Sequence, residues 1–509
     1  MNNKVRTAII MWTLGTLVPS ASYSQQQQPV VEPNIGQPVP AQAALLQGAN
    51  DEGESGGWNI IPFVTLTETY TDDADIDSVI SESDVVSQLT IGTTIDRTGP
   101  RFNLALEYGL TYLYYPGLQG DKDEFRHELQ ANSQTEIVND FLFFDLNAGV
   151  AQTYVDPRQA FSAIEIARTD NRATVAIINA SPYVLRRIGG NFATVETRYE
   201  YTYIDTSQFS TFDGINLGDT FASETHAASI NFNSGTRFSK FIWGWENIYS
   251  QERRTFGNAN NLFSSVVTGE YKLNRSFALI GEAGYTRRES DFFDRTFKGL
   301  VWRVGGRLTP GPRTVIEATY GKEFFGETVN VDASYQITES IVLSGSYNDR
   351  FDSFRSLFVD DFLNGPANNP VDQVLNPIAN EFVRFKTASV SVVGARGRST
   401  ISFLLDYAET SSSGGQQLLN TTRKTAGVIW TRRMSPRLTF TAGATFLEEV
   451  FQFQPGKDHF TSYEGRFDYL ISENITGSIE YVHTDRDQRF FGFTQRGSNY
   501  VSLILGATF

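Results

Sequence analysis

The stretch FNLALEYGLTYLY, residues 102–114, decides the fold of this 509-residue chain. Its large apolar residues occupy every second position: Phe102, Leu104, Leu106, Tyr108, Leu110, Tyr112 and Tyr114. Because successive side chains of a strand point to opposite faces, this spacing predicts a β-strand with one apolar face. The tyrosines gather at one end of that face, where a membrane-spanning strand would meet lipid headgroups.

Similar alternating stretches recur along the chain and are joined by two kinds of connection. Short Gly/Pro turns occur at 97–101, 234–237, 310–313, 394–398 and 434–437. Longer acidic connections at 72–84, 205–219 and 352–380 alternate with them. Short turns at one end and long polar loops at the other are typical of outer-membrane barrels. We find no shared blade or coil signature that would favour a propeller or a β-solenoid.

The pattern predicts an all-β chain with a single transmembrane antiparallel up-and-down β-barrel of about 22 strands over residues 58–509. Residues 1–24 resemble a secretory signal peptide, with Lys4 and Arg6 before an apolar stretch and small residues at 20–24. Residues 25–57 are rich in Gln and Pro and are predicted to be a disordered periplasmic linker. We expect a Gram-negative outer-membrane location, in contact with lipid and lipopolysaccharide.

Composition excludes several function classes. With no cysteine, the chain cannot use disulfides, Cys-ligated metals or thiol catalysis, and 58 acidic against 42 basic residues leave no basic stripe for nucleic acid. Neither a metalloprotease nor a serine-hydrolase nor a nucleotide-binding motif is present, so we predict no enzyme activity and no cofactor. The run Asp72-Asp73-Ala74-Asp75-Ile76-Asp77 is spaced like a calcium ligand set. Simple solvation of an acidic loop is the interpretation we favour.

Alternation assigns fourteen charged residues to the lumen face. They are Glu107, Glu196, Arg198, Glu200, Glu246, Glu282, Arg303, Arg307, Glu317, Asp406, Glu464, Arg466, Asp468 and Glu480. We interpret them first as salt bridges that stiffen the wall, and second as a substrate-selective path.

A barrel of this size is too wide for wall side chains to fill. The 33 residues at 25–57 are too few for the plug domain of large active transporters, so we expect an open lumen or one closed by a loop or a partner. The best candidate is the loop 353–380, in which Phe354, Leu357, Phe358 and Phe362 would form the apolar face of a short gating helix. Alternatively, this loop packs on the barrel rim.

The last strand ends the chain at Phe509. Val501, Leu503, Leu505, Ala507 and Phe509 alternate on one face of the stretch that begins at Tyr500. We interpret Tyr500 and Phe509 as marking the terminal strand read by the barrel-assembly machinery.

The opening strand IPFVTLTETYTDD, residues 61–73, resembles the "ExYTDN" start of a known family. That family is the outer-membrane β-barrel proteins associated with PEP-CTERM (exosortase) exopolysaccharide systems. The similarity continues through 101–117, FRHEL at 125–129 and EIVNDFLFFD at 136–145, with Asp73 where the family commonly has Asn. It is firmest over 60–165 and weaker to the C-terminus.

The resemblance implies a passive conduit for exopolysaccharide, with polysaccharide and a periplasmic polysaccharide-export component as partners. It carries over no catalytic residues. Two alternatives remain: a general diffusion porin for small solutes, and a structural barrel that anchors surface polymer without transport.

Overall fold

The computed structural model describes most of the predicted barrel. It covers residues 57–509 except 79–80, 120–121, 155–161, 163, 165, 208–219, 255–259, 291–294, 354, 357–358, 360–381, 413–419, 453–455 and 488–495. The predicted signal peptide and nearly all of the predicted linker lie outside the described residues.

The described residues form 22 strands. The first eleven are β1 (Trp58–Thr71), β2 (Asp84–Arg97), β3 (Phe102–Tyr114), β4 (Asp123–Val138), β5 (Leu142–Tyr154), β6 (Arg172–Ile188), β7 (Ala193–Ser207), β8 (Thr220–Ser234), β9 (Phe241–Arg254), β10 (Asn260–Lys272) and β11 (Phe277–Ser290). The others are β12 (Arg295–Gly311), β13 (Thr314–Glu323), β14 (Gly326–Thr338), β15 (Ile341–Ser353), β16 (Phe382–Arg396), β17 (Ser399–Ser412), β18 (Thr421–Arg433), β19 (Leu438–Phe451), β20 (Asp458–Ser472), β21 (Ile475–Asp487) and β22 (Arg496–Thr508).

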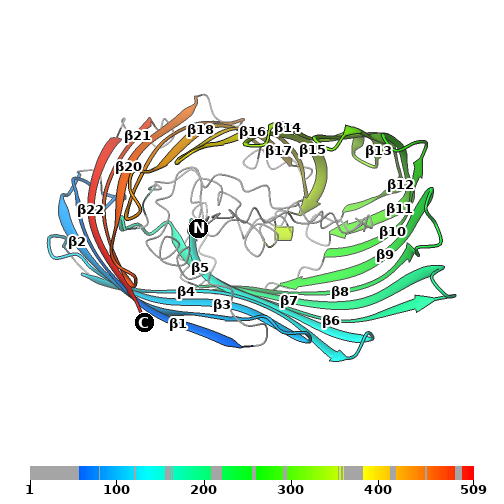
Figure 1. Cartoon of the computed structure of the whole chain (residues 1–509), viewed down its shortest axis with the longest axis horizontal. Coiled ribbons are helices and arrows are strands. Elements are labelled where there is room, and N and C mark those ends of the chain that lie inside the picture. The colour runs from blue at the N-terminus through cyan, green and yellow to red at the C-terminus, as the bar shows by residue number, and fades with distance from the viewer. Residues whose placement is uncertain are drawn as a thin grey trace, which may run out of the picture.

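Every strand pairs with its sequence neighbours in antiparallel register, and β22 returns to pair with β1. The closing register places Phe63 opposite Thr508 and Thr71 opposite Tyr500. Figure 1 shows the resulting ring, in which the red strand β22 lies beside the blue strand β1. The prediction of an all-β, up-and-down barrel is therefore confirmed, and its strand number is 22.

The two ends of the barrel differ as the sequence predicted. The short turns join β2–β3, β8–β9, β12–β13, β16–β17 and β18–β19, at the five Gly/Pro segments. At one of them Gly397 has a positive φ of 61°, a conformation that favours glycine. The long connections follow β1, β7 and β15 at the opposite end. Since β1 starts and β22 finishes at the short-turn end, that end faces the periplasm in an outer-membrane barrel.

The two faces of the wall differ in polarity. Along β1, Leu66 and Tyr70 on the outer face are 45 % and 50 % exposed, whereas Thr67 and Thr69 on the inner face are buried. Large apolar side chains are exposed in the same way around the whole ring, as lipid contact requires. Among the described residues, no helix is long and apolar enough to cross a membrane.

The C-terminal strand separates the two residues assigned to the assembly signal. Phe509 is 74 % exposed, and its backbone N–H donates to the Pro62 carbonyl at 2.9 Å. Tyr500 lies on the opposite face, where it is 1 % exposed and faces the lumen. An outward apolar signal can therefore include Phe509 but not the Tyr500 side chain.

Removal of Phe509 should lower the amount of assembled barrel severalfold, because the last outward aromatic is lost. A Tyr500→Phe variant, which changes only the inner face, should assemble normally. Heat-modifiable migration in gels of outer-membrane fractions measures both. Normal assembly without Phe509 would remove this residue from the signal.

Candidate functional site: the lumen wall and the loops folded into it

Ion pairs link neighbouring strands on the inner wall of β10–β13. The Arg307 guanidinium contacts Glu270 at 2.8 Å and Glu317 at 2.9 Å. Arg303 contacts Glu282 at 3.0 Å, one strand away. Arg303 and Glu282 are directly opposite in the strand register, as are Arg307 and Glu317. Cross-strand opposite charges of this kind stabilise a sheet.

Two further arginines hold the inner wall on other strands. Arg198 of β7 contacts Asp145 of β5 and Glu196 of its own strand, both at 2.9 Å. Arg466 of β20 contacts Asp468 at 2.7 Å. All four arginines assigned to the lumen thus have carboxylate partners, which agrees with their interpretation as wall-stiffening salt bridges.

The remaining lumen-assigned residues are spread around the wall. Glu200 accepts a hydrogen bond from the Asn179 side chain at 2.7 Å, and Glu464 lies over Gly443, where a Cβ would collide with its carboxylate. The others are Glu107, Glu246, Asp406 and Glu480, all at strand positions whose side chains point toward the lumen. Ten carboxylates and four arginines therefore line the lumen in this set, and it does not gather into one pocket.

An Arg303→Gln variant should destabilise the barrel by about 3 kcal/mol, because it leaves two carboxylates unpaired inside the wall. Glu282 and Glu323, its two partners, have side chains that are 14 % and 5 % exposed. An Arg303→Lys variant should recover part of this loss, since lysine restores the charge but not the forked geometry. Denaturant unfolding in detergent measures both, and wild-type stability in Arg303→Gln would contradict the role.

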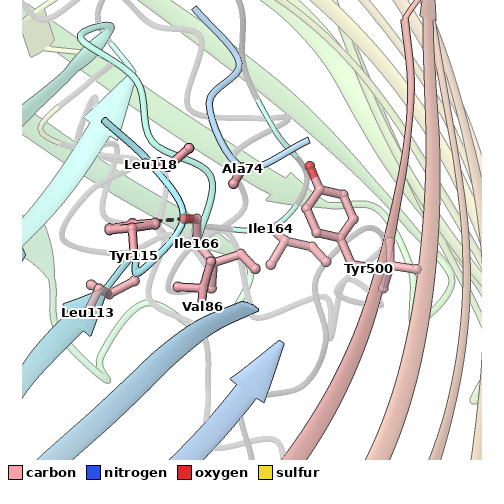
Figure 2. Close-up of a cluster of buried hydrophobic side chains, with 9 residues drawn as sticks. Ala74, Val86, Leu113, Tyr115, Leu118, Ile164, Ile166 and Tyr500 are labelled. Carbon is pink, nitrogen blue, oxygen red and sulfur yellow. Dashed lines mark hydrogen bonds between the residues drawn. The ribbon is translucent and has the colours of Figure 1, made fainter. Parts of the chain in front are cut away.

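A second structure inside the barrel is an apolar cap made by loops. Residues 72–78, 115–119, 162, 164 and 166–171, here called the inner cap, come from the β1–β2, β3–β4 and β5–β6 connections. They share a buried core with the inner face of β2, β3, β21 and β22 (Figure 2). The core consists of Ala74, Val86, Leu113, Tyr115, Leu118, Ile164, Ile166, Val482 and Tyr500.

Hydrogen bonds join the cap segments to one another and to the wall. The Tyr115 hydroxyl donates to the Ile166 carbonyl at 2.9 Å, the contact drawn in Figure 2. The Tyr500 hydroxyl is 3.1 Å from Ser162 Oγ. Arg168 N–H donates to the Ala74 carbonyl at 2.8 Å, so the first and third connections are paired along their backbones. The cap is a packed unit docked on the β22 side of the lumen.

One arginine fastens this cap to the wall. Arg496, the first residue of β22, forms an ion pair with Asp73, whose side chain is 1 % exposed. The same guanidinium donates to the carbonyls of Ile76 at 3.1 Å, Asp75 at 2.9 Å and Ser78 at 2.6 Å. Burial raises the pKa of Asp73, and the hydrogen bonds and charge of Arg496 act in the opposite direction.

The acidic run that resembled a calcium site belongs to this cap. Asp72 accepts hydrogen bonds from Asn499, and Asp77 accepts one from Thr169 Oγ1 at 3.0 Å. Each carboxylate thus has its own protein donors. Within the part of the chain that the structure describes, no group of three ligating side chains could hold a metal ion. The calcium-like spacing in the sequence therefore does not bring these carboxylates together as a calcium site.

The candidate gating loop between β15 and β16 is only partly described. Phe354, Leu357, Phe358 and Phe362 all lie outside the described residues. The backbones at Arg355, Ser356 and Val359 are helical.

The described part of this loop contacts the opposite wall. Arg355 is 4 % exposed, lies 3.5 Å from Glu252 of β9 and donates to the Ser223 carbonyl of β8 at 3.4 Å. Val359 packs against a buried cluster of Val175, Ile177 and Ile204 on β6 and β7. A chain that leaves from β15 therefore crosses the lumen to reach β6–β9.

The base of the same loop is anchored by aromatics that the sequence analysis missed. Phe351 and Phe382 flank the loop and stack with ring centres 5.7 Å apart. Arg288 of β11 lies over both rings and forms an ion pair with Asp352 at 2.8 Å. The sequence does place a phenylalanine at each end of this long connection. Strand alternation alone, however, does not indicate that the two rings stack.

These features define an outer-membrane β-barrel whose lumen holds two of its own inward-folded loop structures. No family model matches the chain, and no curated protein matches it.

Solved structures do resemble it. The FrpB iron transporter from Neisseria meningitidis (F5-1 variant) aligns at 10 % identity and a TM-score of 0.58, covering 92 % of this chain and 84 % of that one. The ferric-catecholate import receptor Fiu from E. coli K12 aligns at 9 % identity and a TM-score of 0.53, covering 90 % and 82 %. The siderophore receptor PiuA from Acinetobacter baumannii aligns at 9 % identity and a TM-score of 0.54, with the same coverage. At such low identity the likeness establishes the barrel fold alone.

Proposed function

We propose that the protein is a gated outer-membrane conduit that releases exopolysaccharide, alongside a PEP-CTERM/exosortase-type polysaccharide system. The observation that carries the gated conduit is the loop that crosses the lumen, where Arg355 from the β15–β16 connection reaches Glu252 on the far wall. A wide barrel obstructed by its own loops suits a pore that must stay closed between transport events. The glycan cargo rests on the sequence resemblance over residues 60–165.

The wall chemistry favours some glycans over others. The lumen-assigned set holds ten carboxylates and four arginines, and all four arginines already have carboxylate partners. A polyanion would meet net repulsion from this set of residues, whereas a neutral polymer would meet hydroxyls and carboxylates that hydrogen-bond sugars. We therefore infer that the cargo is a neutral polysaccharide.

Conductance in planar bilayers tests the proposal. We expect purified barrel to be almost silent, and a variant lacking residues 354–380 to give large, steady currents. A matched variant lacking 413–419, the connection between β17 and β18, should stay almost silent. Neutral dextran should then block the current of the open variant more strongly than dextran sulfate of equal length.

Each alternative has its own outcome. Large, steady currents in the intact protein would mean a general diffusion porin. Silence in both proteins would leave a structural barrel that anchors polymer without transport. Stronger block by dextran sulfate would overturn the neutral cargo while leaving the gated conduit in place.

A further inference from the structure

The periplasmic end of the barrel carries a collar of exposed cations. We define the basic collar as the Lys and Arg residues of seven segments, 98–101, 186–192, 235–240, 272–276, 311–313, 395–398 and 432–437. These segments cover seven of the ten short turns, with the strand ends beside them, and contain thirteen Lys or Arg residues but no Asp or Glu. The other three short turns carry one acidic residue each, Asp140, Glu339 and Glu473. All thirteen are exposed. The concentration is notable in a chain whose net charge is −16.

The collar cations are also free of carboxylate partners. Among the described residues none of them forms an ion pair, although the lumen arginines do. Their few hydrogen bonds go to neutral groups: Arg398 donates to the Met434 carbonyl at 3.4 Å and Arg432 to Ser399 Oγ at 3.5 Å. Unpaired cations of one sign along a rim attract a polyanion or an anionic surface.

Exposed aromatics lie directly beside the collar on the outer face. Trp58, Phe241 and Tyr271 are 54 %, 47 % and 46 % exposed at the periplasmic ends of β1, β9 and β10. Phe241 and Tyr271 are sequence neighbours of the collar residues Lys240 and Lys272. Aromatic rings mark the depth at which hydrocarbon gives way to headgroups, so the collar lies at headgroup level.

We propose that the basic collar binds the anionic phosphate headgroups of phospholipids in the periplasmic leaflet. The cations are distributed around the circumference rather than gathered in one patch, as contact with a surrounding leaflet requires and a single docked protein does not. Lys and Arg beside a membrane are attracted to anionic lipids over about a Debye length. The collar would fix the depth of the barrel, independently of what passes through it.

Native mass spectrometry in detergent, with short-chain phosphatidylglycerol or phosphatidylcholine added, tests this binding. We expect wild type to retain severalfold more phosphatidylglycerol than phosphatidylcholine. A variant with Arg396, Arg398, Arg432 and Arg433, four of the thirteen collar cations, changed to Gln should lose a corresponding part of that preference. The control changes four exposed cations near the other end: Arg253, Arg287, Lys298 and Lys322 to Gln. It should keep the preference.

A variant with the same four collar arginines changed to Lys separates charge from folding. It should retain phosphatidylglycerol at low salt and release it at high salt. No lipid preference in wild type, or an unchanged preference in the Gln variant, would overturn the proposal. If the Gln variant lost a co-purifying acidic protein while its lipid binding stayed unchanged, the collar would bind a protein partner and the lipid proposal would be overturned.

Discussion

An Arg496→Gln barrel should conduct far more often than wild type, and its conductance should increase with pH. Removing one partner of a buried ion pair costs about 3 kcal/mol, which shifts an equilibrium roughly a hundredfold. Here the affected equilibrium is the docking of the inner cap on the wall, which should move toward the undocked state. The reason is that Arg496 contacts Asp73 and three cap carbonyls at once. Single-channel recording measures the open probability of each variant.

The direction of the pH effect follows from Asp73. Burial already raises its pKa above 3.8 in the closed cap, although Arg496 opposes that rise. Without Arg496 the pKa should rise further, so the closed cap favours the protonated carboxyl. A group with a raised folded-state pKa stabilises the closed state at low pH, and this contribution is lost as the pH rises through that value. The variant should therefore close in acid and open toward alkaline pH.

In wild type, Asp77 of the same cap should also make the conductance increase with pH, though more weakly, because burial raises the pKa of this carboxyl too. The matched control is Arg287→Gln, which removes an arginine paired with Glu289 on the outer face of β11. That variant should conduct like wild type at every pH. Equal open probabilities in Arg496→Gln and wild type would show that the cap does not obstruct the pore.

The sequence predicts the barrel because a strand's faces are set by local alternation. Positions 102–114 identify an outer and an inner face without any knowledge of distant residues. Register shifts occur at Leu308/Gly311, Gln336/Thr338 and Leu470/Ser472, close to short turns. Shifts at strand ends leave the alternation of the long central segments intact.

The cap could not be predicted in this way, because its contacts join distant parts of the chain. Arg496 and Asp73 are 423 positions apart, and the Tyr500–Ser162 contact spans 338. In the sequence, Asp73 is one residue of a solvated-looking acidic run, and Tyr500 is one residue of a terminal strand. Neither an acidic run nor an alternating strand indicates which distant residue it will contact.

The β15–β16 loop should be released by a single substitution, Arg355→Gln. Burial lowers the pKa of Arg355 to about 10, so it is still charged at neutral pH and attracted to Glu252. Glu252 keeps Arg254 at 2.6 Å and Asn260 Nδ2 at 3.1 Å after the change. The wall therefore stays intact, and the substitution acts on the loop alone.

We expect Arg355→Gln to reproduce much of the current gained by deleting residues 354–380, with an unchanged denaturant midpoint. Arg253→Gln is the matched control, since Arg253 is a neighbouring arginine on β9 whose side chain is 61 % exposed. A wild-type current in Arg355→Gln would mean that the cross-lumen contact does not hold the loop in place.

The double variant Arg355→Gln/Arg496→Gln tests how the two obstructions combine. The cap docks on the β22 side of the lumen and the loop reaches the β6–β9 side, so each should block a different part of the cross-section. Openings in each single variant and larger currents in the double variant, which frees both parts of the cross-section, are expected. If the double variant conducts no more than the stronger single variant, one obstruction alone closes the pore and the other serves the stability of the wall.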